Sequence, residues 1–188
     1  MYNAYLKNTH DHLLSKIDLS QHSSVLDVSA GTGLLAEELI LKFGPFDQLV
    51  LNDPSTKMLE VAEKRLKTHN NIEFAGFFAE KLNFPENTFD HIICLNSFHY
   101  YADQEKAMKQ LKKVLKPDGT LWVQDWDRVG AFRIAIKLID WLSPENINVR
   151  SLNEMKILLD DHDFSIVEQN QWRFRWWNFF FIRADLKK

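Results

Sequence analysis

The chain has 188 residues, 45% of them hydrophobic and 26% charged, with a formal net charge of −3. This size and composition predict one globular domain. Acidic and basic residues are interspersed along the chain and form no basic block of the kind that binds phosphate backbones, so no nucleic-acid partner is expected. Charges interrupt every apolar stretch before the roughly 20 residues that span a bilayer, and the N-terminal stretch has no signal or transit pattern. Because Cys94 is the single cysteine, no internal disulfide forms, and we expect a cytoplasmic protein.

Apolar residues alternate between the period of a strand and that of a helix along most of the chain. After a helical segment at about 2–17, the predicted strands are SVLDV at 24–28, QLVLN at 48–52, IEFAGFF at 72–78, DHIICLN at 90–96 and TLWVQD at 120–125. The helices between them are predicted at 34–43, 56–69 and 104–116, and Pro117-Asp118-Gly119 stops the last one. This alternation favours a doubly wound, Rossmann-like α/β fold with a mainly parallel sheet.

The tail breaks this alternation. Ser151–Glu154 is a capping box that opens a helix, and aromatic-rich strands follow at about 164–172 and 177–185. With no helix between them these strands pair antiparallel, so we predict a seven-stranded sheet with an antiparallel C-terminal hairpin that buries one face against helices. The predicted parts of this single domain are an N-terminal helical lid at 1–20, a cofactor-binding core at 21–127, and a substrate-side helix with the C-terminal strands at 128–188.

A glycine turn follows the first predicted strand, where the carboxyl ends of parallel strands hold ligands. Gly31-Thr32-Gly33 opens a helix, and the stretch also fits the loose dinucleotide fingerprint, with Asp53 at a suitable distance for a ribose. Asp27 separates the two interpretations, because its carboxylate would repel a pyrophosphate but attract a ligand with a sulfonium and an ammonium group. The pattern therefore favours S-adenosylmethionine over NAD, and an NAD-dependent oxidoreductase is the rival enzyme class.

Taken together, ordered motifs in the chain resemble the class I S-adenosylmethionine-dependent methyltransferases. The resemblance is greatest to the branch that contains ubiquinone and menaquinone C-methyltransferases and many small-molecule methyltransferases. The motifs that carry it are Val25–Gly33, Asn52–Ser55 followed by Met58-Leu59, Ala79–Asp90 and Leu111–Val123. It implies in-line methyl transfer from S-adenosylmethionine to a small-molecule substrate. The alternative is a non-catalytic S-adenosylmethionine-binding module or a partner subunit.

The resemblance also implies roles for individual residues. Gly31 and Gly33 would let the backbone approach the methionine part of the cofactor, whose cationic end would lie near Asp27. Asp53 would accept hydrogen bonds from both ribose hydroxyls, although it would equally serve to cap the next helix. The cofactor-binding set that follows comprises Asp27, Ser29, Ala30, Gly31, Gly33, Asp53, Pro54, Met58, Phe78, Ala79, Glu80, Leu95 and Asn96, with no metal ligand.

Two positions depart from the family pattern. Ser29 stands where the family usually has glycine, which predicts a strained or shifted backbone if that position needs a positive φ. Phe78 stands where the family often has an aspartate that receives the adenine amino group. Its ring would stack on adenine, with Ala79 and Glu80 as the polar contact, unless it is a plain strand residue.

Methyl transfer mainly needs donor and acceptor held in line and water excluded, with a general base for some acceptors. In the NSFHYYAD stretch after the fourth strand, His99 and Tyr100 are the predicted catalytic residues, and Tyr101 is a further wall candidate. A purely structural histidine is the alternative. Further residues expected at the site are Asp125, Trp126 and Asp127, and Tyr2 and Tyr5, which would close over the cofactor or staple the first helix. The acceptor and the oligomeric state stay open.

Overall fold

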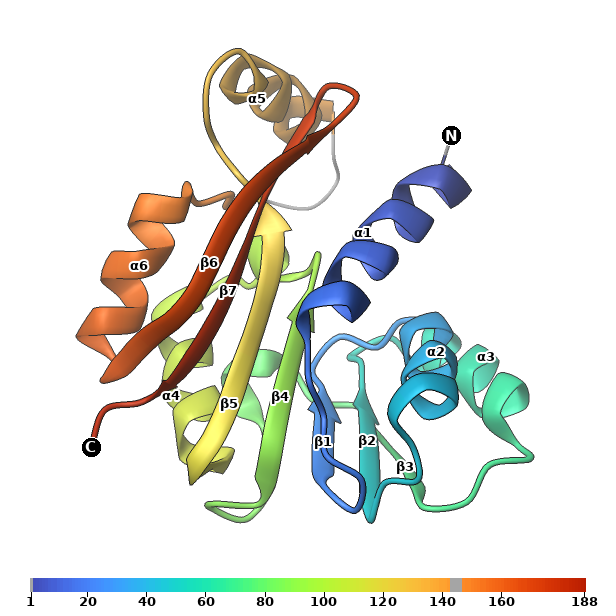
Figure 1. The fold of residues 1–188 in the computed structure, drawn as a ribbon. Coiled ribbons are helices and arrows are strands. Elements are labelled where there is room, and N and C mark those ends of the chain that lie inside the picture. Colours follow the sequence, from blue (N-terminus) through green and yellow to red (C-terminus); the bar gives the residue numbers. More distant parts are fainter. Residues whose placement is uncertain (1, 143–146) are drawn as a thin grey trace.

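The computed structural model describes residues 2–142 and 147–188, with side chains from residue 4 onward (Figure 1). Strands and helices alternate as predicted through the first two thirds of the chain. The elements in order are α1 (Tyr2–Lys16), β1 (Ser24–Asp27), α2 (Leu34–Phe43), β2 (Gln48–Asn52), α3 (Thr56–Leu66), β3 (Ile72–Ala75), η1 (Ala79–Lys81), β4 (Phe89–Leu95), η2 (Phe98–Tyr100), α4 (Gln104–Val114), β5 (Leu115–Trp126), α5 (Phe132–Leu142), α6 (Leu152–Asp161), β6 (Phe164–Phe174) and β7 (Trp177–Leu186).

The strands form one seven-stranded sheet in the order β3-β2-β1-β4-β5-β7-β6. Strands β1 to β5 pair in parallel, whereas β7 runs antiparallel to both β5 and β6. The predicted fold class is therefore confirmed. The order reverses between β1 and β4, and in such sheets ligands bind outside the carboxyl ends of the strands at this switch point.

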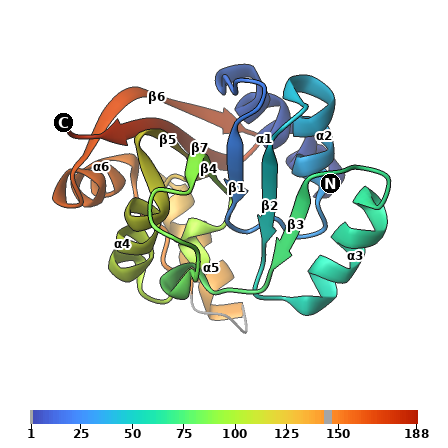
Figure 2. The same cartoon turned by 90° about the horizontal axis from the view of Figure 1, so that it is seen from below.

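Helices cover both faces of the sheet, because successive strand residues point to opposite faces. Val25 and Leu49 pack in one cluster with residues of α1, α2 and α3, while their neighbours Leu26 and Val50 pack in another with residues of α4 and α6. Figure 2 shows α4 and α6 on the opposite side of the sheet from α1 and α2. The sheet is thus buried on both faces, as a parallel sheet requires.

Several predicted boundaries were wrong. The helix predicted at 104–116 ends at Val114, because Leu115 is fully buried and already pairs with Phe89 of β4. The expected stop signal at 117–119 lies inside β5, where the register shifts between Phe89 and His91. Helix α3 and strand β3 also end earlier than predicted, and α5 is a helix that the periodicity left unassigned.

The hairpin strands differ in burial. In β6, buried or half-buried residues alternate with exposed ones, which confirms the predicted burial of one face. In β7, Phe179, Phe180, Phe181 and Ile182 are all buried. The expectation of a single buried face was wrong for β7, because this strand lies between β5 and β6 and is covered on both sides. The capping box at Ser151 and Glu154 is present as predicted.

Candidate active site

A cavity of about 590 Å³ opens at the carboxyl ends of β1, β4 and β5. Its wall is formed by the glycine turn, the start of α2, η2, the end of β5, the start of β7 and the first turns of α1. Of the predicted site residues, it brings together Asp27, Ser29, Ala30, Gly31, Met58, Leu95, Asn96, His99 and Tyr100. A volume of this size suits one small-molecule ligand.

The two glycines of the turn have different roles. Gly31 lines the cavity with φ +54°, and a Cβ added there would meet no atom within 4 Å. Gly33 has φ +73°, and its Cβ would lie 3.1 Å from the Cβ of Ala62 in α3. Gly33 therefore lets α2 pack against α3 and does not line the cavity, so only Gly31 is placed for the predicted close approach to a ligand. Ser29 has no positive φ, so the strain considered for it is absent.

Asp53, directly after β2, holds the glycine turn in place. Its Oδ2 accepts the Gly31 N–H at 2.9 Å and its Oδ1 accepts the Ser55 N–H at 2.9 Å. The cap of α3 is Ser55, whose hydroxyl accepts the Met58 N–H at 3.4 Å, so the alternative of Asp53 as the helix cap was wrong. Asp53 lies outside the cavity wall, and its ribose role stays a prediction.

Asp27, the last residue of β1, is 2% exposed and lines the cavity. The pKa of Asp27 is raised from 3.8 to about 7, mainly by burial and to a smaller extent by the Asp53 carboxylate, while the Ser29 backbone N–H opposes the shift. A positively charged ligand would favour the ionised form and lower this pKa. The site therefore has a buried carboxyl group whose ionised form a cationic ligand would stabilise.

His99 lines the opposite wall and forms a buried pair with Asp125, which was expected at the site but does not itself line the cavity. The two residues are 2% and 3% exposed, and His99 Nδ1 lies 2.5 Å from Asp125 Oδ1. Since a carboxylate only accepts, Nδ1 carries the proton in this bond, and in the neutral imidazole Nε2 then holds the lone pair. The Asp125 carboxylate also accepts the backbone N–H groups of His99 and Trp126 at 2.9 and 2.7 Å, which fixes its position.

Two buried polar atoms of the cavity wall have no hydrogen-bond partner within the described residues. They are Nε2 of His99 and Oδ1 of Asn96. Asn96 follows β4 directly and has φ +51°, in the left-handed region that asparagine tolerates better than most non-glycine residues. Buried polar atoms are nearly always paired, so unpaired ones that line a cavity point to a ligand.

Rings form the rest of this wall. Trp126 stacks on His99 at 4.2 Å between ring centroids and donates its indole N–H to the Tyr5 hydroxyl at 2.7 Å. Trp177 lies 4.8 Å from Trp126 and 5.3 Å from Tyr5 between centroids. Tyr5 lines the cavity and holds α1 to the body through Trp126, as the staple role requires, whereas its closure over the cofactor stays a prediction. The side chain of Tyr2 lies outside the described residues.

Two expected wall residues lie elsewhere. Tyr101 is buried, and its hydroxyl contacts Ser29 Oγ at 3.0 Å and Ser97 Oγ at 3.2 Å, so it supports the turn from behind. Asp127 is fully buried and accepts the Leu152 N–H at 3.1 Å, which ties β5 to α6. The prediction that these two face the cavity was wrong.

Four other predicted cofactor residues lie outside the cavity wall. Pro54 is exposed, Phe78 is 61% exposed, Ala79 is buried at the start of η1, and Glu80 accepts the Asp103 N–H at 3.2 Å. Their roles stay predictions. The described residues also contain no group of three or more His, Cys, Asp or Glu that could hold a metal ion.

Sequence reasoning missed part of the wall, namely Leu6, His10, Thr32, Leu34, Leu35 and Trp177. Trp177 reaches the site because β7 runs antiparallel to β5 and begins at the carboxyl end of β5. Trp126, the last residue of β5, pairs with Phe179, two residues after Trp177. The available signal was the antiparallel pairing itself, which places the hairpin turn at this end of the sheet.

Residues 26–123 match the family described as Methyltransferase domain, which is about half of the chain. The chain belongs to this methyltransferase family. The predicted resemblance is thus confirmed, and S-adenosylmethionine is the cofactor of the family.

A curated relative, the ubiquinone/menaquinone biosynthesis C-methyltransferase of Hahella chejuensis, is 33% identical over 118 residues. The match covers 61% of this chain and 47% of that protein, so the chain spans about half the length of the curated relatives it matches.

Solved structures share the fold at low identity. A SAM-dependent methyltransferase from Aquifex aeolicus has a TM-score of 0.74 at 22% identity and covers 94% of this chain and 89% of its own. The cyclase SpnF has a TM-score of 0.80 at 16% identity, with 96% and 81% covered. Since a cyclase also has this fold, the chemistry has to be argued from the site.

Proposed function

We propose that this chain transfers a methyl group from S-adenosylmethionine to a small-molecule acceptor and that His99 is the general base. The observation that carries the proposal is the buried Nε2 of His99, which lines the cavity without a partner among the described residues while Asp125 holds the other ring nitrogen. A side chain this well oriented, with a free lone pair at a ligand cavity, is suited to accept a proton from a bound acceptor.

The polar wall of the cavity, which comprises the glycine turn, Asp27 and Asn96, fits the cofactor. The open space at Gly31 admits a ligand close to the backbone, and the start of α2 offers N–H groups without a side-chain cap for a carboxylate. Oδ1 of Asn96 is free to accept from an ammonium group, and Asp27 would balance positive charge. Asp53, next to the turn, would accept from the ribose hydroxyls.

When bound, S-adenosylmethionine supplies a methyl group activated by its sulfonium. The protein then has to hold the acceptor in line with that methyl group, exclude water and remove one proton. His99 Nε2 would take the proton from the acceptor as the methyl group is transferred, and the cofactor would leave as S-adenosylhomocysteine. Asp125 stabilises the resulting imidazolium without moving.

The rings favour a largely apolar, planar acceptor. Tyr5, Trp126 and Trp177 line the same cavity as His99 and offer flat surfaces for stacking. The curated relatives are named C-methyltransferases, so a ring carbon activated by an adjacent acidic hydroxyl is the first acceptor type to try. Loss of the hydroxyl proton to His99 would make that carbon nucleophilic. After methylation the same carbon would release its ring proton and the oxygen would take a proton back from His99, so that one proton is lost in total.

Calorimetry and a turnover assay test the proposal together. S-adenosylmethionine and S-adenosylhomocysteine should bind, NAD and NADP should not, and hydroxylated aromatic acceptors should yield S-adenosylhomocysteine. Tight binding of NAD without S-adenosylmethionine would contradict the methyltransferase assignment. Cofactor binding without turnover on any acceptor of this panel would favour the non-catalytic alternative.

A further inference from the structure

Helix α5 exposes a continuous apolar stripe. Ile134, Leu138, Trp141 and Leu142 are 74%, 56%, 79% and 66% exposed. Their spacing of four, three and one residues places them on one side of the helix. The opposite side of α5 packs on the body of the protein through Phe132, Ile136 and Ile139. The exposed stripe is therefore not the face that holds α5 in place. Apolar patches of this kind mark surfaces that bind something.

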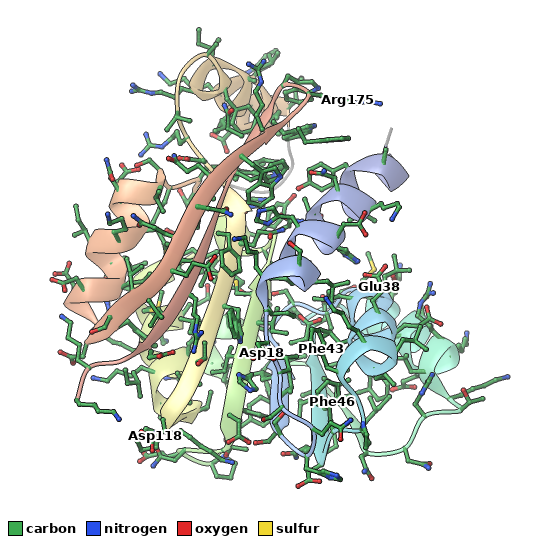
Figure 3. The ribbon with its side chains drawn as sticks, viewed as in Figure 1. Asp18, Glu38, Phe43, Phe46, Asp118 and Arg175 are labelled. Atoms are coloured by element: carbon green, nitrogen blue, oxygen red, sulfur yellow. The ribbon has the colours of Figure 1, made fainter. Side chains whose placement is uncertain are left out.

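Cations flank this stripe. On α5 itself, Arg133 and Lys137 each precede an exposed apolar residue, which puts them along one edge of the stripe. Arg173 and Arg175 lie at the turn between β6 and β7, and Figure 3 shows Arg175 at the end of the hairpin beside α5. None of these four forms a salt bridge within residues 2–142 and 147–188.

The surface formed by α5 and the β6–β7 turn is also connected to the cavity by aromatic side chains. Phe132 of α5 contacts Trp176 at 6.0 Å between centroids, and Trp176 stacks on Trp177 at 3.9 Å. Trp176 is 42% exposed, whereas Trp177 lines the cavity. Figure 1 shows α5 and the hairpin turn together beyond the carboxyl end of β5. An aromatic path thus runs from the outer surface of this end to the proposed acceptor space.

We propose that α5 and the β6–β7 turn dock on the surface of an anionic phospholipid bilayer. The stripe would enter the boundary between headgroups and acyl chains, with Trp141 and Trp176 at the depth that tryptophan prefers, and the four cations would face lipid phosphates. A protein partner would not by itself call for tryptophan and unpaired cations at one rim. Docking would also let an apolar acceptor pass from the lipid into the cavity, a consequence that rests on the proposed function.

Such docking is peripheral. Helix α5 has 11 residues, about half of what a bilayer span needs. In the part of the chain that the structure describes, no helix is long and apolar enough to cross a membrane. The helix would lie in the plane of the interface.

Flotation with vesicles tests the proposal, using phosphatidylcholine alone and phosphatidylcholine with one quarter phosphatidylglycerol. The wild-type chain should float with the anionic vesicles and less with the neutral ones. Leu138→Asp should lower the bound fraction by about tenfold, because an apolar contact becomes a charge. Leu41→Asp is the matched control: Leu41 is 78% exposed on α2, away from the stripe, and the variant should bind like wild type.

A second variant keeps the test independent of one substitution. Arg173→Glu with Arg175→Glu should abolish the preference for anionic vesicles and leave affinity for S-adenosylhomocysteine unchanged. Absence of vesicle binding by the wild type would overturn the proposal, as would equal losses in Leu138→Asp and Leu41→Asp. If sedimentation instead shows a wild-type dimer that Leu138→Asp dissociates, a second copy covers the stripe and the membrane proposal is wrong. None of these results depends on turnover, so they are separate from the test of the proposed function.

Discussion

The cavity has two unlike walls. One is built from the end of β1, the glycine turn and the start of α2, and it presents backbone groups together with the buried carboxyl of Asp27. The other is built from η2, the end of β5, the start of β7 and α1, and it presents rings around the His99–Asp125 pair. The first comes mainly from one short stretch of chain, whereas the second joins residues as distant as Tyr5 and Trp177.

This difference separates the two tasks of the proposed enzyme. A wall made by a local strand-turn-helix unit keeps its shape whatever happens at the C-terminal hairpin, so cofactor binding can stay constant. A wall assembled from distant elements can change its rings, and with them the acceptor, without disturbing the glycine turn. Variants on the two walls should therefore affect different measured quantities.

The largest effect is expected at the ring wall. His99→Asn should lower kcat by about 10²- to 10⁴-fold, because a general base contributes in this range. Affinity for S-adenosylhomocysteine should stay within about twofold of wild type, since only a transition-state interaction is lost. Asp125→Asn should also lower kcat without affecting cofactor affinity, because the amide has one acceptor oxygen instead of two and no charge to stabilise the imidazolium. Parallel losses of kcat and cofactor affinity in His99→Asn would mark His99 as structural.

On the polar wall, the two glycines provide a matched pair. Both have positive φ, so alanine at either position should cost about 1 to 2 kcal/mol of stability. Gly31→Ala should also weaken S-adenosylhomocysteine binding by about tenfold, because its methyl group stands in the open space of the cavity wall. Gly33→Ala should cost more stability, since its methyl group meets Ala62, and change affinity less. Calorimetry and thermal melts on both variants measure this; a larger affinity loss at Gly33 would reverse the assignment.

Asp27 should give a smaller effect that depends on pH. Since burial raises the pKa of Asp27 to about 7, the free site is partly protonated at neutral pH, and a cationic cofactor binds the ionised form better. Affinity for S-adenosylmethionine should therefore rise severalfold from pH 6 to pH 8, and Asp27→Asn should remove this dependence. Titrations at several pH values check the slope. A slope that persists in Asp27→Asn would assign it to another group.

The same carboxyl affects stability with a defined sign. Its folded pKa of about 7 exceeds the unfolded value of about 3.8, so its contribution to stability is fully present below pH 3.8 and is lost as the pH rises to 7. Asp27→Asn should thus be more stable than wild type at pH 8, by on the order of a few kcal/mol. Chemical denaturation at pH 5 and pH 8 would show a larger gain at pH 8. An equal gain at both pH values would contradict the shift.

The smallest effect is expected from Tyr5→Phe. It leaves the ring in the wall but removes the hydroxyl that accepts the Trp126 indole N–H, at a cost of about 1 kcal/mol. The KM for the acceptor should rise a few-fold while cofactor affinity stays constant, because only the ring wall loosens. Steady-state kinetics with each substrate varied in turn will show this. An unchanged acceptor KM with weaker cofactor binding would place Tyr5 on the cofactor side.

The polar wall was largely predictable and the ring wall only in part, for a physical reason. Asp27 and Gly31 lie within one strand-turn-helix unit, whose periodicity and turn chemistry are visible locally. His99 was recognisable by its place after the fourth strand, but its bond to Asp125 depends on how β4 and β5 pair. Trp177 reaches the cavity only through the antiparallel return of β7. Local patterns also did not distinguish the packing role of Gly33 from the ligand-facing role of Gly31.

A crystal structure of the chain with S-adenosylhomocysteine tests the division between the two walls most directly. The amino-acid end of the ligand should lie against Gly31, Asp27 and Asn96, with its sulfur directed toward the part of the cavity that His99 and Trp126 line. Density for the ligand outside this cavity, or with its sulfur directed away from His99, would contradict the account.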